Sequence, residues 1–302
     1  MVIMSAFNQD VLLLGVDGGG TRCRARLTDA DGSVLGHGVA GPANIRFGVT
    51  ESFAAVHDAV GQCLEHSGLS GADHRIVACL ALAGASEPRE LAQAQSYPHP
   101  FRRTIVTTDA EAACVGAHGG EDGGIVIVGT GSIGWANVRG RCYRVGGWGF
   151  PLSDEGSGAW IGSEILRRVF WARDGRIGWT SVLDAVFERF GGDPHEIVRW
   201  MGTARPRDFA SLAPLVVEHA AAGDAGAVEV INLAAKHVEQ MLERLQQFGA
   251  PRLALMGGLA GKVEPYLSSR FRDMLSPPIG DALSGALHLA RCVAERLALV
   301  EA

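Results

Sequence analysis

The sequence predicts an α/β protein whose two halves begin with the same pattern. The first observation is an apolar run at 11–16 that ends in Asp17 and three glycines and then continues as residues alternating at period two. The second is a repeat of this pattern at 123–147, where "GGIVIV" runs into "GTGS" and another alternating segment. Helical patterns occupy most of the chain between and after these segments. Strands that alternate with helices favour sheets covered by helices, and two such sets favour two domains.

The first half predicts its elements in order. The segment 23–27, "CRARL", alternates apolar residues with arginines and is therefore expected to be a strand. Asp31–Gly32 is a strong hairpin-turn signal. Thr50 is expected to cap a helix that ends at Gly68. The remaining elements are strands at 75–84 and 104–109 and helices from Pro88 and at 110–118.

In the second half, the glycine turn raises the question of a nucleotide-binding loop. "GTGSIG" (129–134) matches GxGxxG, but in a dinucleotide-binding unit a helix follows that motif. Here "WANVRGRCYRV" alternates and contains its own turn, so both glycine turns are expected at the tips of β-hairpins. Helices are expected at about 154–172, 180–190, 207–222, 225–248, 263–275 and 282–300, with one strand at 252–258.

Composition limits the class of protein. The 302 residues suffice for two domains of about 150 residues each. A net charge of −6 without any basic block argues against a nucleic-acid partner. No apolar run approaches the roughly 18 residues of a membrane span, and the first residues lack the features of a secretory signal. Six cysteines without CxxC or zinc spacing predict scattered thiols in a cytoplasmic enzyme.

Seven segments occur in an order typical of one protein family. They are "GVDGGGTRCRAR", "GPANIRFGV", "LALAGA", "TDAEAACVGAH", "GTGSIG", "GGWGFPLSDEGSGAWIG" and "GGLAG". With them the chain resembles the BadF/BadG/BcrA/BcrD ATPase-like group of the actin/hexokinase/Hsp70 superfamily, and within it the N-acetylglucosamine and glucosamine kinases. The resemblance implies two ribonuclease-H-like (actin-like ATPase) domains with an active-site cleft between them. We expect them at 1–113, with 282–302 packing back on this domain, and at 114–281.

The resemblance also assigns roles to matching residues, with ATP and Mg²⁺ as cofactors. The first phosphate loop would be Asp17, Gly18, Gly19, Gly20 and Thr21, with Asp17 holding Mg²⁺ through water. The second phosphate loop would be Gly129, Thr130, Gly131 and Ser132. The adenosine would border Gly257 and Gly258, and Ser211, at a helix start, is a further candidate for the nucleotide. The sugar site would contain Asn44, Ala83, Gly84, Asp109, Gly147, Trp148, Gly149 and Asp154, and Asp109 would be the catalytic base.

Some of these residues also have ordinary structural explanations. Asp109 follows a strand and starts a helix, so it is a candidate N-cap as well as a base for a primary alcohol. Asp154 and Glu155 are expected to open a helix after Ser153, where acids complement the helix dipole. Asp154 is preferred as an acceptor for sugar hydroxyls, and the role of Glu155 is left open.

The other candidates likewise have both a structural and a functional interpretation. Thr21 and Thr130 are turn residues or phosphate ligands, and the matching hydroxyls at both turns favour phosphate. Asn44 is a loop residue whose amide can both donate to and accept from sugar hydroxyls. Trp148 stands among glycines, which predicts an exposed ring able to stack on a sugar or contact an acetyl methyl.

The expected activity is transfer of the ATP γ-phosphate to the 6-hydroxyl of N-acetylglucosamine, with glucosamine as the alternative. "GGWG" favours the acetylated sugar, whereas Ile133 after "GTGS" and the segment "SDEGSGA" favour glucosamine. An ATPase that activates a radical reductase is the alternative from another class. It would need cluster-ligating cysteines, for which Cys114 and Cys142 are the nearest candidates. The expected partner is a small-molecule amino sugar, with no nucleic acid or membrane, and a homodimer is left open.

Overall fold

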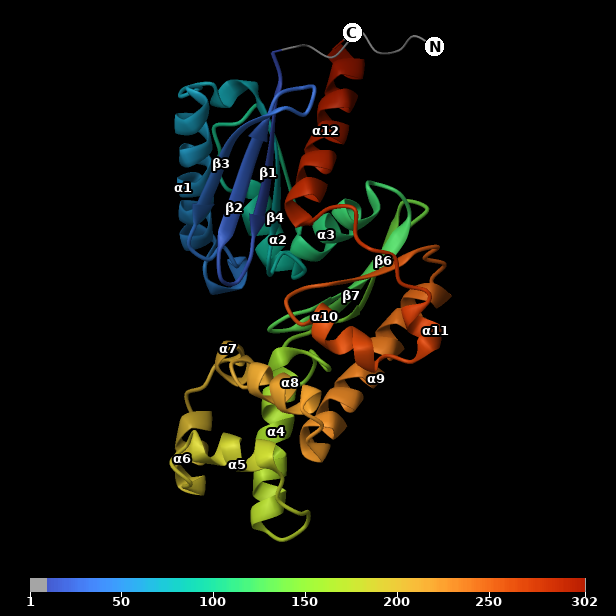
Figure 1. Ribbon diagram of the computed structural model, residues 1–302. Helices are drawn as coiled ribbons and strands as arrows, with labels where there is room; N and C mark the ends of the chain where they lie inside the picture. Colours follow the sequence, from blue (N-terminus) through green and yellow to red (C-terminus); the bar gives the residue numbers. More distant parts are fainter. Residues whose placement is uncertain (1–9, 302) are drawn as a thin grey trace. The chain divides into compact units, whose positions relative to one another are not determined.

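The computed structural model describes residues 10–301, which form two units (Figure 1). Unit 1 combines the chain up to Asp122 with the segment from Pro278, and unit 2 is Gly123–Pro277. The sequence places the corresponding boundaries at 113/114 and 281/282. The stretch before Asp10, where the sequence predicts no secretory signal, lies outside the described residues.

Unit 1 contains a five-stranded sheet in the order β3-β2-β1-β4-β5. The first three strands are antiparallel: β1 (Leu12–Gly18), β2 (Cys23–Thr28) and β3 (Val34–Ala40). The other two, β4 (Ile76–Leu82) and β5 (Arg103–Thr108), run parallel to β1. The expected hairpin is confirmed, because Gly18 pairs with Cys23 across the first glycine turn.

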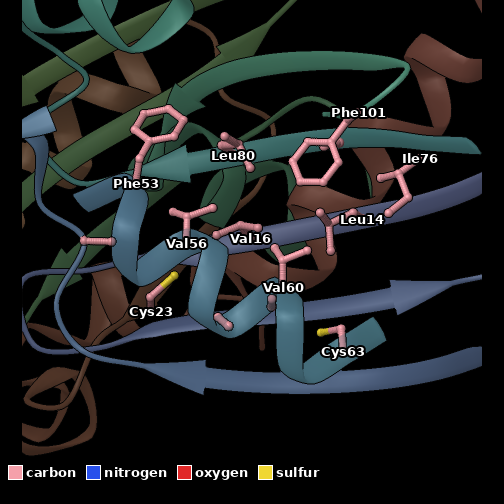
Figure 2. Packing of buried hydrophobic residues seen from close by; sticks show 14 of the residues in the cluster. Leu14, Val16, Cys23, Phe53, Val56, Val60, Cys63, Ile76, Leu80 and Phe101 are labelled. Carbon is pink, nitrogen blue, oxygen red and sulfur yellow. The ribbon is translucent and has the colours of Figure 1, made fainter. Parts of the chain in front are cut away.

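Helices cover both faces of this sheet. One face packs on α1 (Val49–Ser67), and Figure 2 shows Phe53, Val56 and Val60 of that helix against Leu14 and Val16. The other face packs on α3 (Asp109–His118) and α12 (Ala282–Glu301). Three short helices complete the unit: η1 (Ile45–Phe47), η2 (Asp73–Arg75) and α2 (Pro88–Ser96).

Unit 2 begins with the same strand arrangement on a smaller scale. Its sheet has the order β8-β7-β6-β9, with β6 (Gly123–Val128), β7 (Ser132–Val138) and β8 (Arg141–Gly146) antiparallel. The strand β9 (Leu253–Met256) runs parallel to β6. The second glycine turn therefore also lies at a hairpin tip, between Val128 and Ser132.

The rest of unit 2 is helical. The helices are α4 (Gly158–Arg173), α5 (Ser181–Glu188), α6 (Pro194–Met201), α7 (Pro206–Ala210), α8 (Ala213–Ala221), α9 (Ala225–Gln247), α10 (Ala260–Val263), η3 (Glu264–Tyr266) and α11 (Ser269–Arg272). Residues of α9 also pack on β6 and β7, which joins the helical core to the sheet. Within residues 10–301, no helix is long and apolar enough to cross a membrane.

Several helix boundaries differ from the sequence-based expectation. Asp154 and Glu155 do not open a helix, because Asp154 has a left-handed backbone (φ 68°) and α4 begins only at Gly158. The cap of α4 is Ser157, whose hydroxyl accepts from the amide of Trp160 at 3.2 Å. The predicted cap of α1, Thr50, lies inside the helix instead, since the N-cap is Gly48.

Two expected segments also differ in their continuity, and one helix was not expected. The helix expected at 207–222 is interrupted at 211–212 and forms α7 and α8. The segment expected as one helix at 263–275 contains η3. Pro265 lies within η3, and because proline has no backbone N–H it cannot continue the hydrogen bonding of an α-helix. The helix α6 is additional, and Asp193 caps it by accepting from the amide of His195 at 2.8 Å.

Helix α1 lies directly against the backbone of β3. A β-carbon at Gly38 would come within 1.8 Å of the carbonyl oxygen of Ala59, and one at Gly36 within 2.3 Å of that of Cys63. Both obstacles are backbone atoms of α1, so no side-chain rotation can relieve the overlap. By contrast, a β-carbon at Gly61 of the same helix would meet no heavy atom within 4 Å.

The same substitution should therefore have opposite effects at these two glycines. We expect Gly38→Ala to lower the free energy of unfolding by about 1–3 kcal/mol or more, because α1 must move off the sheet. We expect Gly61→Ala to raise it by about 0.5–1 kcal/mol, since alanine favours a helix interior. Urea unfolding of the wild type and the two variants measures both changes in the free energy of unfolding. An unchanged midpoint for Gly38→Ala would contradict the close approach.

Candidate active site

The first glycine turn is pinned to two neighbouring loops by backbone hydrogen bonds. The amide of Ala83 donates to the carbonyl of Gly18 at 2.7 Å, and the amide of Ala43 donates to that of Gly19 at 3.0 Å. A β-carbon at Gly18 would lie 2.6 Å from the Leu82 side chain, so only glycine permits this contact. Gly20 and Thr21 at the tip are exposed, which leaves this part of the loop accessible to a ligand.

Asp17, the last polar residue of β1 before the turn, is held by Arg24. The two residues are paired in the β1–β2 register, and Nε and Nη2 of Arg24 donate to Oδ2 of Asp17 at 3.1 and 2.6 Å. The third donor, Nη1, bonds to Oδ2 of Asp281 at 2.9 Å. Asp281 in turn accepts from the amide and hydroxyl of Ser284, both at 3.0 Å, at the start of α12. One guanidinium thus links the turn to the last helix.

These contacts also fix the charge state of Asp281. Burial by itself opposes ionisation of the carboxyl, but the hydrogen bonds from Ser284 and the neighbouring Arg24 cation outweigh burial and lower the pKa of Asp281. Asp281 is therefore a carboxylate when it pairs with Arg24. The sequence analysis missed this role of Arg24. Its signal was the register of the hairpin, because the residue four positions beyond the last glycine pairs with the residue before the first one.

Three of the sugar-site candidates of unit 1 lie together at the carboxyl end of β4. The amide of Ile45, next to Asn44, donates to the carbonyl of Ala83 at 3.0 Å. A β-carbon on Gly84, whose φ is 87°, would lie 2.7 Å from Oδ1 of Asn44. Oδ1 of Asn44 accepts from the amide of Arg46 at 3.1 Å. The close approach of Gly84 thus depends on the absence of a side chain.

Asp109 follows β5, the strand beside β4. The N-cap of α3 is Thr108, whose hydroxyl accepts from the amide of Glu111 at 3.0 Å, so the capping interpretation of Asp109 is wrong. Oδ1 of Asp109 accepts from the adjacent amide of Ala110 at 2.9 Å. The parallel strands β4 and β5 pair Leu82 with Thr108, so Ala83 and Asp109 both follow strand ends at one edge of the sheet. Ligands in α/β sheets bind outside such ends.

The second glycine turn rests on the N-terminus of α4. The amide of Gly158 donates to the carbonyl of Gly129 at 2.8 Å, and that of Ala159 to Thr130 at 3.1 Å. The buried hydroxyl of Ser132 donates to the carbonyl of Glu155 at 2.7 Å, whereas Thr130 is exposed. Of the two hydroxyl residues of this turn, Thr130 is therefore the one accessible to a ligand.

Three segments that the sequence connects with the nucleotide meet at Gly158. A β-carbon there would lie 3.2 Å from the Gly129 carbonyl, 3.2 Å from Leu259 and 3.1 Å from Ala210. Leu259 directly follows Gly257 and Gly258, and Ala210 precedes Ser211. Gly257 has a φ of 95° and would place a β-carbon 2.4 Å from the Val128 carbonyl. The hydroxyl of Ser211 donates to the carbonyl of Asp208 at 2.7 Å.

The loop after β8 holds Asp154 beside the second turn. Oδ1 of Asp154 accepts from the amide of Gly149 at 3.1 Å, and a β-carbon on Gly131 would lie 2.6 Å from Oδ2. Burial raises the pKa of Asp154, although hydrogen bonds from the backbone of Gly149 and Phe150 act in the opposite direction. Gly147 and Gly149 both have positive φ, 70° and 106°, which shapes the loop around the acid.

Trp148 is 66% exposed, as the sequence predicts. The guanidinium of Arg144 lies over the Trp148 ring, 3.9 Å from the ring centroid. Nε of Arg144 donates to the carbonyl of Gly146 at 3.0 Å, and Nη2 donates to that of Gly147. The sequence analysis missed Arg144, whose only signal was its place in the alternating strand before the glycines. A cation therefore lies against the aromatic surface next to Asp154.

The chemistry of unit 1 fits a hydrated Mg²⁺ at Asp17. Both Arg24 contacts fall on Oδ2, so Oδ1 is the oxygen available to such an ion. Among the described residues, no group of three or more His, Cys, Asp or Glu side chains could hold a metal by itself. Mg²⁺ characteristically keeps several waters and binds one or two carboxylates together with substrate phosphates. The exposed turn residues Gly20, Thr21 and Thr130 are the ones whose backbone N–H groups suit phosphate oxygens.

Comparisons with known proteins agree over nearly the full chain. The BadF/BadG/BcrA/BcrD ATPase family matches residues 14–289. The glucosamine kinase GspK of Vibrio cholerae is 40% identical over 92% of this chain and 95% of its own length. The crystal structure of a putative N-acetylglucosamine kinase from Chromobacterium violaceum is 36% identical, with a TM-score of 0.86 over 93% of this chain and 99% of that one. A ROK family glucokinase from Streptomyces griseus, 18% identical with a TM-score of 0.53 over 93% and 99%, shares the fold.

Removing the guanidinium of Arg24 should loosen the first glycine turn. We expect Arg24→Gln to lower the free energy of unfolding by about 1–3 kcal/mol, because two carboxylates lose charged hydrogen bonds. Binding of Mg²⁺–ATP, measured by calorimetry, should weaken as well, since Asp17 loses its fixed position. Arg89→Gln, which removes the same charge from the exposed surface of α2, is the control and should change neither quantity. Equal effects of the two variants would contradict a positioning role for Arg24.

Proposed function

Because this chain belongs to the BadF/BadG/BcrA/BcrD ATPase family, we propose that it is an ATP-dependent amino-sugar kinase that phosphorylates the 6-hydroxyl of glucosamine. The observation that carries the proposal is the 40% identity to a named glucosamine kinase along nearly the whole of both chains. The second observation is that both glycine turns form exposed hairpin tips, each held in place by backbone hydrogen bonds.

In this proposal Asp109 accepts the proton of the sugar hydroxyl. Phosphoryl transfer needs an aligned nucleophile and electrostatic stabilisation more than covalent chemistry. A carboxylate at a strand end, on a residue that the helix does not need as its cap, suits the role of base. The N–H groups of the turns at Gly18–Thr21 and Gly129–Ser132 would orient the phosphates. Mg²⁺ held by Asp17 through water would supply neutralising charge.

Sugar hydroxyls would bond to polar groups of fixed geometry. Asn44 presents an amide beside Gly84, and Asp154 is oriented by the amide of Gly149. A carboxylate in this position can accept from two neighbouring hydroxyls. Partial burial makes each such bond more valuable, because a polar group left unpaired there costs about 1–3 kcal/mol.

The choice between the two sugars rests on opposing observations. The sequence alone slightly favours N-acetylglucosamine, whereas the named relative favours glucosamine. The carboxylates of Asp154 and Glu155 would attract the ammonium group of glucosamine. N-Acetylglucosamine is the second candidate, because the exposed Trp148 ring offers an apolar surface and the Arg144 cation on it would repel an ammonium.

Activation of a radical reductase is the weaker alternative. That role requires cysteine thiolates that can bind an iron–sulfur cluster shared between subunits. Cys114, one of the two candidates, is fully buried within α3, where its thiol cannot reach a subunit surface. The other, Cys142, is exposed on β8. Iron analysis of the purified protein separates this alternative from the kinase.

A sugar panel tests the proposed substrate. ADP release should be measured with glucosamine, N-acetylglucosamine, glucose and N-acetylmannosamine, in the wild type and in Trp148→Ala. We expect glucosamine to have the highest kcat/KM, and Trp148→Ala to reduce kcat/KM for N-acetylglucosamine more than for glucosamine. A preference for N-acetylglucosamine would reverse the order of the two candidates. No sugar-dependent ADP release would contradict a kinase.

A second variant tests the base. Asp109→Asn keeps the shape of the side chain but removes the proton acceptor, so kcat should fall by about 10²–10⁴-fold while the affinity for sugar changes little. Asp184→Asn, the same change at an exposed position of α5, is the control. Full activity of Asp109→Asn would remove this residue from the mechanism.

A further inference from the structure

A polar cavity lies in unit 1, formed by β1, β2, the turn after β2 and the last helix. Its volume is about 300 Å³, within the size range of small-ligand pockets. Three basic side chains line it, Arg26, His288 and Arg291, together with Thr28 and the apolar Leu13 and Leu287. None of these residues belongs to the proposed catalytic site.

The sheet geometry explains why Arg26 enters this cavity. Residues two apart on a strand point to the same face, so Arg26 shares the α12 face of the sheet with Arg24. Its cross-strand partner in β1 is Gly15, which has no side chain, and its partner in β3 is His37. A β-carbon at Gly15 would lie 2.8 Å from Leu287 of α12. The absence of that carbon lets α12 pack directly against β1 beside Arg26.

Arg24 and Arg26 differ in the charges that surround them. Arg24 bonds to two carboxylates, Asp17 and Asp281. Nε of Arg26 is buried, and no residue in the described part of the chain accepts a hydrogen bond from it. A buried donor without a partner costs about 1–3 kcal/mol, so the protein holds the Arg26 guanidinium without the compensation that Arg24 receives.

Two acids close to the cavity in sequence, Asp29 and Asp281, are already engaged by other groups. Asp29, in the adjoining turn, accepts from the amides of Asp31 and Ser33 at 3.0 and 2.8 Å. Asp281 accepts from Arg24 and Ser284. Arg291 donates through Nη1 to the carbonyl of Ala30 at 2.7 Å, which fixes its guanidinium beside the turn at Gly32. The residues that line the cavity therefore include three basic groups and no carboxylate.

We propose that this cavity binds a phosphate monoester of about the size of a hexose phosphate. Guanidinium groups bind phosphate through paired, charge-assisted hydrogen bonds, and two of them converge here from different elements. The Thr28 hydroxyl adds a polar group, and the two leucines face the carbon skeleton of the ligand. The ligand would join β2 to α12, the same elements that the Arg24–Asp281 pair joins closer to the glycine turn. The proposal does not depend on the kinase activity.

Isothermal titration of the full chain with glucose 6-phosphate, and separately with inorganic phosphate, tests this proposal. We expect Arg26→Gln and Arg291→Gln each to weaken binding of the ester about tenfold or more, and the double variant to abolish it. Arg89→Gln, which removes the same charge from the exposed surface of α2, should bind as the wild type does. Ligand should also raise the midpoint of thermal unfolding of the wild type and not of the double variant.

Three results would overturn the proposal. One is the absence of binding by the wild type up to about 10 mM, which corresponds to a negligible affinity. Another is an unchanged affinity in the double variant together with a loss in Thr21→Val, which would place the ester at the first glycine turn instead. The third is binding of inorganic phosphate as tight as that of glucose 6-phosphate, which would show that the cavity does not select a phosphate ester. Because Arg26 and Arg291 lie on different elements, the test survives if one variant folds poorly.

Discussion

The arrangement of the candidate site in unit 1 depends on the carbonyl groups of Gly18 and Gly19, which accept from the amides of Ala83 and Ala43. These two hydrogen bonds join the hairpin tip to the end of β4 and to the loop that carries Asn44. Gly18 fits closely here, since a β-carbon would lie 2.6 Å from the Leu82 side chain and 3.1 Å from the Ala43 carbonyl. The proposed phosphate loop and the proposed sugar contacts of this unit are therefore positioned by the same few backbone atoms.

In unit 2 the glycine turn is held in place by a helix instead of by the end of a neighbouring strand. The turn accepts from the first amides of α4, and Gly158 fits closely between Gly129, Ala210 and Leu259, 3.1–3.2 Å from where its β-carbon would lie. The left-handed backbone at Asp154 delays the start of α4 and turns the carboxylate toward Gly131. In both units a short glycine-rich turn is rigid because its backbone is bonded on the inner side, while its tip residues, Thr21 and Thr130, are exposed.

Sequence patterns predicted the features that are local in the chain. Alternation at 23–27 and at 135–145 was sufficient to recognise two hairpins and to reject a dinucleotide-binding loop. Local patterns failed where a distant contact decides the outcome. One local feature was also misplaced by a single residue, because the hydroxyl of Thr108 and not the carboxylate of Asp109 accepts from the amide of Glu111. The roles of Arg24 and Arg144 could not be assigned either, because one depends on Asp281 at the far end of the chain and the other on the fold of the glycine loop around Trp148.

Identification of the reaction product tests the central claim most directly. The protein should be incubated with ATP, Mg²⁺ and glucosamine, and the mixture analysed by phosphorus–proton correlation NMR. The account predicts ADP together with an equal amount of a phosphate monoester whose phosphorus couples to the two protons on carbon 6 of the sugar. Unchanged ATP, or ADP with free phosphate and unmodified sugar, would contradict it.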